Sequence, residues 1–178
     1  MTKQPTKKKV NSKRKGNRAE LELAKILTKH FGTPFARVGV SSGARTKNTK
    51  LPGNAVSVMT GDLIEPAGFR FSIESKSVNI DIDFFEPSAA FEKWLRQATD
   101  EAESVGKLPM LCWKQPYKGW LVAVPARSFK FGGNYGAYYV RYANNTQQWL
   151  WGWIVLRLDA LLEVNQDTHE FWFDKTKE

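Results

Sequence analysis

Residues 69–78 have the sequence FRFSIESKSV, in which apolar and polar side chains alternate from Phe69 to Glu74. A strand places successive side chains on opposite faces, so this pattern predicts a β-strand with one face in the protein core. The core face would carry Phe69, Phe71 and Ile73, and the other face Arg70, Ser72, Glu74 and Lys76. The polar face of this strand therefore carries a carboxylate and an amine two residues apart.

The rest of the chain supplies partners for this strand. Apolar residues recur at helical spacing in residues 18–31 and again after Ser88, which is a typical N-cap residue, up to Gly106. Further strands are predicted at residues 35–40, 56–64, 110–114 and 120–124. We therefore expect an α/β fold, with a central mixed sheet of about five strands flanked by helices.

The predicted domain organisation has three parts. Residues 1–15 are polar and rich in lysine, which predicts a disordered basic arm. Residues 16–178 are expected to form one domain, with a core at about 16–125 and an aromatic-rich extension at about 126–178. In the extension, alternation of Trp149, Trp151 and Trp153 predicts strands or a hairpin, followed by a short segment at 159–164. Most of the seven tryptophans are expected to be packing residues.

The net charge of +9 is concentrated at the amino terminus, where residues 1–18 hold eight of the 27 basic residues and no acidic one. Such an arm suits contact with the phosphates of nucleic acid, although a solubilising tail is an equally good interpretation. Residues 41–54 form a long loop rich in Ser, Gly, Lys and Arg that would add positive potential. No apolar stretch is long enough to span a membrane, and a cytoplasmic protein is predicted.

Metal chemistry is limited by the ligands available. The single Cys112 rules out a cysteine-based zinc site, and His30 and His169 show no zinc-binding spacing. Any metal ion must be held mainly by oxygen atoms, which favours Mg²⁺, with Mn²⁺ as a substitute, and no small-molecule cofactor is indicated.

Asp62 is the residue that would complete the site. If residues 56–64 and 69–78 pair as a hairpin around Ala67, Asp62 lies opposite Ser72 with Glu74 on the neighbouring diagonal. A register slip of one residue would send Asp62 to the other face. Two carboxylates so close repel each other unless a cation compensates, and a divalent ion does this better than Lys76 alone. Such an ion could activate water against a phosphate, with Lys76 orienting that water or stabilising the transition state.

The order of these features resembles the PD-(D/E)xK nuclease superfamily. The residues that carry the likeness are the sequence KGNRAE at 15–20 leading into a helix, SSG at 41–43, Gly61-Asp62, and IESK at 73–76. Within that superfamily the pattern is most similar to archaeal Holliday-junction resolvases and their phage relatives. The likeness covers roughly residues 13–125 and leaves the carboxy-terminal region unexplained.

The resemblance implies a role for each matching residue. Asp62 and Glu74 would bind the metal ion together with the backbone carbonyl of Ser75, and Lys76 would position the attacking water. Glu20 would reach a second metal ion or its waters, although a helix-stabilising charge in the first turn explains it as simply. Contacts to DNA are expected from Lys13, Arg14, Lys15, Arg18, Ser41, Ser42, Arg45, Lys47 and Gln97.

The implied function is cleavage of branched DNA, most specifically four-way junctions, by a homodimer in a prokaryotic or phage-infected cell. Three alternatives stay open. The protein could be a restriction- or repair-type nuclease acting on duplex DNA, or a non-catalytic nucleic-acid-binding protein, or Glu74 and Lys76 could be a plain ion pair on an exposed strand. Gly61 departs from the motif, which has proline at that position.

Overall fold

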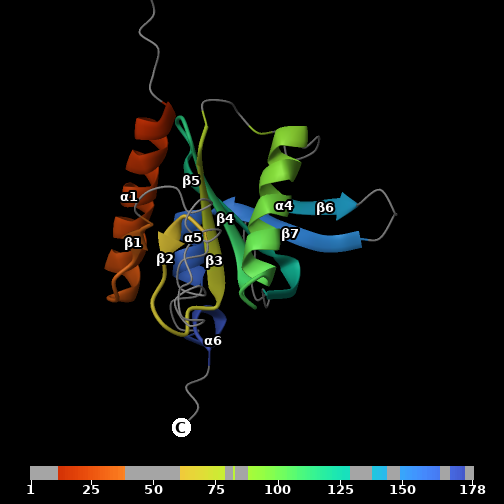
Figure 1. Ribbon diagram of the computed structural model, residues 1–178. Helices are drawn as coiled ribbons and strands as arrows, with labels where there is room; N and C mark the ends of the chain where they lie inside the picture. The colour runs from red at the N-terminus through yellow and green to blue at the C-terminus, as the bar shows by residue number, and fades with distance from the viewer. Residues whose placement is uncertain are drawn as a thin grey trace, which may run out of the picture.

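A five-stranded mixed sheet forms the centre of the molecule (Figure 1), in the order β3-β4-β5-β7-β6. The computed structural model describes residues 12–38, 61–78, 82, 88–128, 138–143, 149–164 and 169–174. The strands are β3 (Phe71–Ser77), β4 (Leu108–Gln115), β5 (Gly119–Pro125), β7 (Trp149–Arg157) and β6 (Tyr138–Ala143). β3 and β4 are parallel and the other neighbours are antiparallel. The predicted central mixed sheet flanked by helices is thus confirmed.

Helix α4 (Ala89–Glu103) joins the two parallel strands and covers one face of the sheet. The side chain of Ser88 accepts a hydrogen bond from the backbone N–H of Phe91 at 3.3 Å, which is the predicted N-cap. Phe91, Leu95 and Ala98 pack against apolar side chains of β4, β5 and β7. The helix ends three residues before Gly106, whose φ of 69° turns the chain towards β4.

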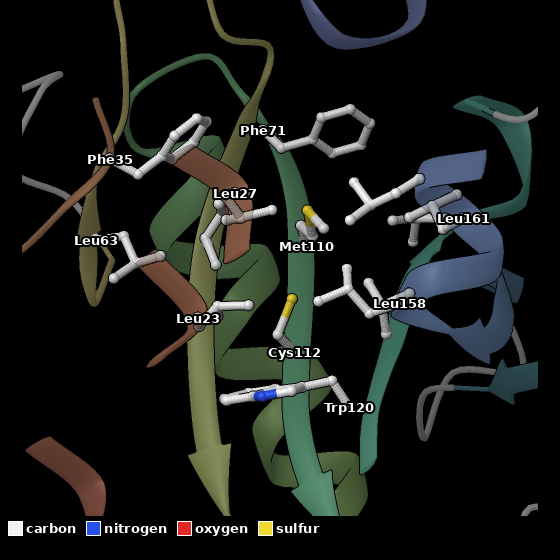
Figure 2. Close-up of a cluster of buried hydrophobic side chains, with 14 of the residues drawn as sticks. Leu23, Leu27, Phe35, Leu63, Phe71, Met110, Cys112, Trp120, Leu158 and Leu161 are labelled. Atoms are coloured by element: carbon white, nitrogen blue, oxygen red, sulfur yellow. The ribbon is translucent and has the colours of Figure 1, made fainter. Parts of the chain in front are cut away.

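The opposite face of the sheet is covered by α1 (Ser12–Phe31), α5 (Leu158–Val164) and α6 (His169–Trp172). Figure 2 shows part of the hydrophobic core that these helices form with the sheet. Leu23 and Leu27 of α1 contact the same core as Met110 of β4 and Leu161 of α5. This is the apolar stripe predicted for residues 18–31. The described part of the chain has no helix that is long and apolar enough to cross a membrane.

The start of α1 corrects the predicted boundary of the disordered arm. The helix begins at Ser12, so Lys13, Arg14 and Lys15 are helical. Lysine and arginine are good helix formers, and a helix that is anchored by packing further along can extend through them. Residues 1–11, the rest of the predicted arm, lie outside the described residues.

The expected hairpin between residues 56–64 and 69–78 is wrong. Strand β2 (Leu63–Ile64) pairs antiparallel with β1 (Ala36–Arg37), in a separate two-stranded sheet. The chain bends at Gly61, which has a φ of 88°, and beyond the bend Asp62 keeps one backbone hydrogen bond to Ile73 of β3 while Leu63 and Ile64 pair with β1. Residues 39–60, with the predicted loop at 41–54 and the first part of the predicted strand, lie outside the described residues.

The carboxy-terminal strands continue the same sheet. β6 and β7 form the predicted hairpin, and β7 pairs with β5, with Trp153 opposite Pro125 and Val155 opposite Ala123. A short 3-10 helix, Ala126–Ser128, follows β5. Buried packing tryptophans, as the sequence predicts, are found in the described ranges at Trp113, Trp120, Trp153 and Trp172.

Candidate active site

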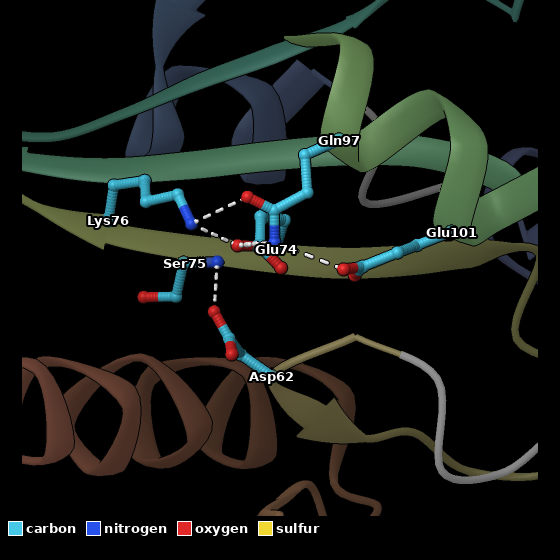
Figure 3. A network of polar contacts seen from close by, with 6 residues as sticks. All are labelled: Asp62, Glu74, Ser75, Lys76, Gln97 and Glu101. Carbon is cyan, nitrogen blue, oxygen red and sulfur yellow. Dashed lines mark hydrogen bonds and ion pairs between the residues drawn. The ribbon is translucent and has the colours of Figure 1, made fainter. Parts of the chain in front are cut away.

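Asp62 lies in a bend beside the open edge of β3 (Figure 3). Its backbone N–H donates to the carbonyl of Ile73 at 2.9 Å, and its Oδ2 accepts from the backbone N–H of Ser75, also at 2.9 Å. The bend requires Gly61, because a Cβ there would lie 2.7 Å from the Ile73 carbonyl oxygen. The same positive φ explains why proline is absent here, since its ring fixes φ at a negative value.

Glu74 and Lys76 extend from β3 towards α4 and form an ion pair (Figure 3). Both also contact Gln97 on α4. Gln97 Nε2 donates to Glu74 Oε1 at 2.9 Å, and Lys76 Nζ donates to Gln97 Oε1 at 3.2 Å. Glu74 is almost fully buried, with 3% of its surface exposed. The alternation predicted from the sequence therefore holds, and α4 covers the polar face of β3.

The electrostatics of the site are unfavourable for two negative charges. Burial is the main cause that raises the pKa of Asp62, and the nearby carboxylates of Glu20 and Glu101 raise it further. Burial also raises the pKa of Glu74, with Asp62 as the second cause, and Lys76 only partly offsets these effects. Carboxyl groups whose ionisation is disfavoured in this way would gain from a shared cation.

Glu20 lies on α1 and pairs with Arg37 of β1. Its carboxylate accepts a hydrogen bond from Arg37 Nε at 2.5 Å, and Arg37 Nη2 donates to Asn17 Oδ1 at 2.8 Å. The Glu20 charge is close enough to raise the pKa of Asp62. Arg37 of β1 is thus the ion-pair partner of Glu20.

The donor set can be compared with the needs of a divalent ion. Within the described residues, no three His, Cys, Asp or Glu side chains gather as a metal-binding group. The set suggested by the sequence differs from such a group, because it has two carboxylates and the backbone carbonyl of Ser75. Within a strand, the carbonyl of a residue points to the same side as its N–H, so the Ser75 carbonyl faces the edge where Asp62 lies. Oxygen donors of this kind fit Mg²⁺ or Mn²⁺.

The structure brings together five of the residues predicted from the sequence: Asp62, Glu74, Ser75, Lys76 and Gln97. Lys13, Arg14, Lys15 and Arg18 lie in the first turns of α1. In Figure 1 this end of α1 is at the same end of the molecule as the carboxyl end of β3 and the start of α4. Ser41, Ser42, Arg45 and Lys47 lie outside the described residues.

Two residues of this region are not predicted by the sequence. Glu101 accepts from Gln97 Nε2 at 3.0 Å and raises the pKa of both Asp62 and Glu74. Its spacing of four residues from Gln97 on an amphipathic helix is a signal that could have identified it. Arg37, the partner of Glu20, has no comparable signal, because the pairing depends on how β1 lies against α1.

The edge strand β3 carries Glu-x-Lys, and Asp62 lies beside it on the preceding bend, which is the arrangement expected from the resemblance to PD-(D/E)xK nucleases. A comparison with family models agrees, because residues 11–170 match the family described as "Phage putative PDDEXK endonuclease". This match covers most of the chain, so the chain belongs to this PD-(D/E)xK family.

A curated relative is Protein D14 of Escherichia phage T5, which is 29% identical over 118 residues. The aligned region covers 65% of this chain and 71% of the relative. No solved structure gives a significant match.

Proposed function

We propose that this protein is a Mg²⁺-dependent endonuclease that cuts branched DNA, with four-way junctions as its preferred substrate. The observation that carries the nuclease part is the hydrogen-bonded cluster of Glu74, Lys76 and Gln97 at one edge of the sheet, with the Asp62 carboxylate bound to the N–H of Ser75 on the same strand. The preference for junctions rests on the sequence resemblance to junction resolvases.

In this proposal Asp62, Glu74 and the Ser75 carbonyl hold Mg²⁺, or Mn²⁺ in its place. A bound divalent ion lowers the pKa of a coordinated water and neutralises charge on the phosphate. The protein's own contribution is to exclude competing solvent from Glu74 and to fix the carboxylates: Asp62 through the Ser75 N–H, and Glu74 through Gln97. Glu20 is proposed to orient further water or a second ion.

Lys76 is the residue proposed to act on the attacking water. An ammonium group has three N–H donors, and the contacts with Glu74 and Gln97 account for two of them. The third can donate to a water or to a phosphate oxygen. The side-chain carbonyl oxygen of Gln97 accepts from the Lys76 ammonium, and the side-chain amide of Gln97 donates to the Glu74 carboxylate. Gln97 therefore fixes these two groups relative to each other.

The DNA is proposed to lie at the end of the molecule where α1 begins and β3 ends. Lys13, Arg14, Lys15 and Arg18 would contact phosphates there. The loop residues Ser41, Ser42, Arg45 and Lys47, and Gln97 next to the reacting groups, are proposed as further contacts. The reaction is phosphodiester hydrolysis that leaves 5′-phosphate and 3′-hydroxyl ends. A four-way junction is twofold symmetric, so a homodimer acting in the cytoplasm of the phage-infected host completes the proposal.

The test is a cleavage assay on a labelled immobile four-way junction and a linear duplex of the same sequence, with Mg²⁺ and with chelator. Wild-type protein should make paired, Mg²⁺-dependent nicks in the junction. Lys76→Ala should lower the rate by about 100-fold or more, since it removes a group that acts on the reacting atoms. Lys93→Ala, which changes an exposed lysine on α4, is the matched control and should cut normally.

Other outcomes of the same assay separate the alternatives. Equal cutting of both substrates would replace the junction proposal by a duplex endonuclease of the restriction or repair type. Binding without cutting at any Mg²⁺ or Mn²⁺ concentration would identify a non-catalytic nucleic-acid-binding protein.

A further inference from the structure

β3 is an edge strand of the described five-stranded sheet. On its outer side, two of its backbone N–H groups donate hydrogen bonds to carboxylates. Ser75 N–H donates to Asp62 Oδ2 at 2.9 Å, and Ile73 N–H donates to Glu65 Oε1 at 3.0 Å. The Ile73 carbonyl accepts from the N–H of Asp62. A short segment that carries both acids is therefore attached by hydrogen bonds to the side of β3 where a neighbouring strand would otherwise pair.

Glu65 is the most deeply buried charged side chain in this arrangement, with 0% of its side chain exposed. Its second oxygen pairs with Lys107 Nζ at 3.1 Å. Lys107 follows α4, and its own N–H donates to the Ala102 carbonyl at 2.9 Å. Glu65 thus connects the segment carrying Asp62 both to β3 and to the end of the helix that carries Gln97.

A buried ion pair of this kind contributes little to stability compared with a well-packed apolar pair, because both groups lose their hydration. What Glu65 adds is position. The Asp62 carboxylate is joined to β3 through the Ser75 N–H, so its direction depends on how the segment is aligned with the strand. Glu65 fixes that alignment one backbone donor further back along the same edge, at Ile73.

We propose that Glu65, held by Lys107, is a positioning residue that aligns the Asp62 carboxylate for binding the divalent ion in the proposed endonuclease. The contacts along the β3 edge support the alignment of Asp62 by Glu65. The effect of that alignment on ion binding and cleavage rests on the proposed function. Glu65 does not touch the reacting atoms, and acts through the segment that it shares with Asp62.

The test compares wild-type protein with the double variant Glu65→Leu/Lys107→Met, in which apolar side chains of similar size replace the ion pair. This replacement is chosen so that the fold stays stable while the acceptor for Ile73 N–H is removed. The measured quantities are Mn²⁺ affinity by electron paramagnetic resonance, kcat and KM for DNA cleavage, and amide hydrogen exchange at Ser75. Thermal unfolding verifies that the variant is folded.

We expect a folded variant with Mn²⁺ binding and kcat each reduced by about tenfold or more, and with unchanged KM for DNA. Exchange at the Ser75 amide should become faster by about the same factor, on the order of tenfold. Glu65→Gln keeps an oxygen for Ile73 N–H and should recover most of the Ser75 protection. If the double variant unfolds, the single variants Glu65→Gln and Glu65→Leu are compared instead, by the same exchange measurement at low temperature. Equal protection of the Ser75 amide in these two variants would overturn the proposal.

A stable double variant with wild-type Ser75 protection, Mn²⁺ affinity and kcat would also overturn it, and would show a purely structural ion pair. If the wild-type protein itself neither cuts DNA nor binds Mn²⁺, the proposed function fails. In that case Ser75 exchange still decides whether Glu65 aligns Asp62, so the two failures can be told apart.

Discussion

The individual residues of the candidate site carry charges in places where charge is costly. Burial raises the pKa of both Asp62 and Glu74, and the neighbouring carboxylates Glu20 and Glu101 add to the negative potential. The ammonium group of Lys76, which contacts Glu74, only partly compensates. A site of this kind is most stable with either a bound proton or a bound cation.

This balance predicts how a divalent ion should affect stability. The raised pKa values mean that the folded protein binds protons more tightly than the unfolded chain does, so these groups favour folding at low pH. Their contribution is lost as pH rises through the raised pKa values of Asp62 and Glu74. Mn²⁺ should therefore raise the melting temperature more at about pH 8.5 than at about pH 5.5, where protons compete with it.

The size of the effect follows from mass action, with about 2.7 kcal/mol of stabilisation at a free concentration of about 100 times Kd. Glu74→Gln should abolish most of the Mn²⁺-induced shift, while Glu103→Gln, which changes an exposed acid on α4, should keep it. Differential scanning fluorimetry measures both. An equal shift in the two variants would place the ion elsewhere.

Gly61 permits a test of the bend that carries Asp62. Gly61→Ala places a Cβ 2.7 Å from the Ile73 carbonyl oxygen, in a backbone conformation with a φ of 88°. Gly32→Ala is a close control, because Gly32 has a φ of 67° and nothing lies within 4 Å of its added Cβ.

Both variants carry backbone strain of about 1–3 kcal/mol. Only Gly61→Ala should in addition displace Asp62 and lose cleavage. Urea denaturation and the cleavage assay compare the two, and a fully active Gly61→Ala would contradict the close approach described for this bend.

Among the helices and strands, α1 combines two tasks. Its apolar stripe packs on the sheet, and its first turn has no acidic residue to complement the positive end of the helix dipole. Basic side chains at a helix amino terminus are slightly unfavourable on their own, so a polyanion nearby would relieve them. DNA is therefore expected at this end of the molecule.

The basic residues of α1 should control the salt dependence of DNA binding. The variant Lys13→Ala/Arg14→Ala/Lys15→Ala should reduce the slope of log K against log salt by about 0.9 for each phosphate that the protein no longer neutralises. Junction and duplex should be affected alike. Lys25→Ala/Lys29→Ala, in the second half of the same helix, should keep the wild-type slope. Fluorescence anisotropy at several salt concentrations measures the slope. An unchanged slope in the triple variant would show that the basic first turns of α1 do not contact the DNA.

These elements differ in how well the sequence predicts them. Residues 69–78, the helix after Ser88 and the strands at 110–114 and 120–124 are predictable, because their apolar periodicity is set by the core that they share. The pairing of β2 with β1 is not, because it depends on a bend at Gly61 and on two very short strands. Asp62 still reaches the strand of Glu74, but through a backbone bond to Ile73 and not through a hairpin register.

Across the entire fold, the aromatic-rich carboxy-terminal strands belong to the same sheet as the candidate site. β7 pairs with β5, and its Trp153 contributes to the core beneath α4. Among the described residues, β3, which carries Glu74 and Lys76, forms one edge of this sheet and β6 forms the other. Gln97 and Glu101 on α4 depend on that packing for their approach to β3.

The assembly predicted for junction cleavage is a dimer, since two symmetric cuts need two active sites. Sedimentation velocity on the full chain should give twice the 20.3 kDa monomer mass at the concentrations used for cleavage. A monomer both free and on junction DNA would contradict paired cutting, and would favour a nuclease that makes single nicks.

The assignment of the active site is tested by a single-turnover experiment on a preformed complex of the protein with labelled junction DNA, in chelator, started by adding Mg²⁺. We expect prompt cleavage by wild-type protein and none by Glu74→Gln, with both proteins binding the DNA equally before the ion is added. Cleavage by Glu74→Gln at the wild-type rate would contradict the assignment to Asp62, Glu74 and Lys76.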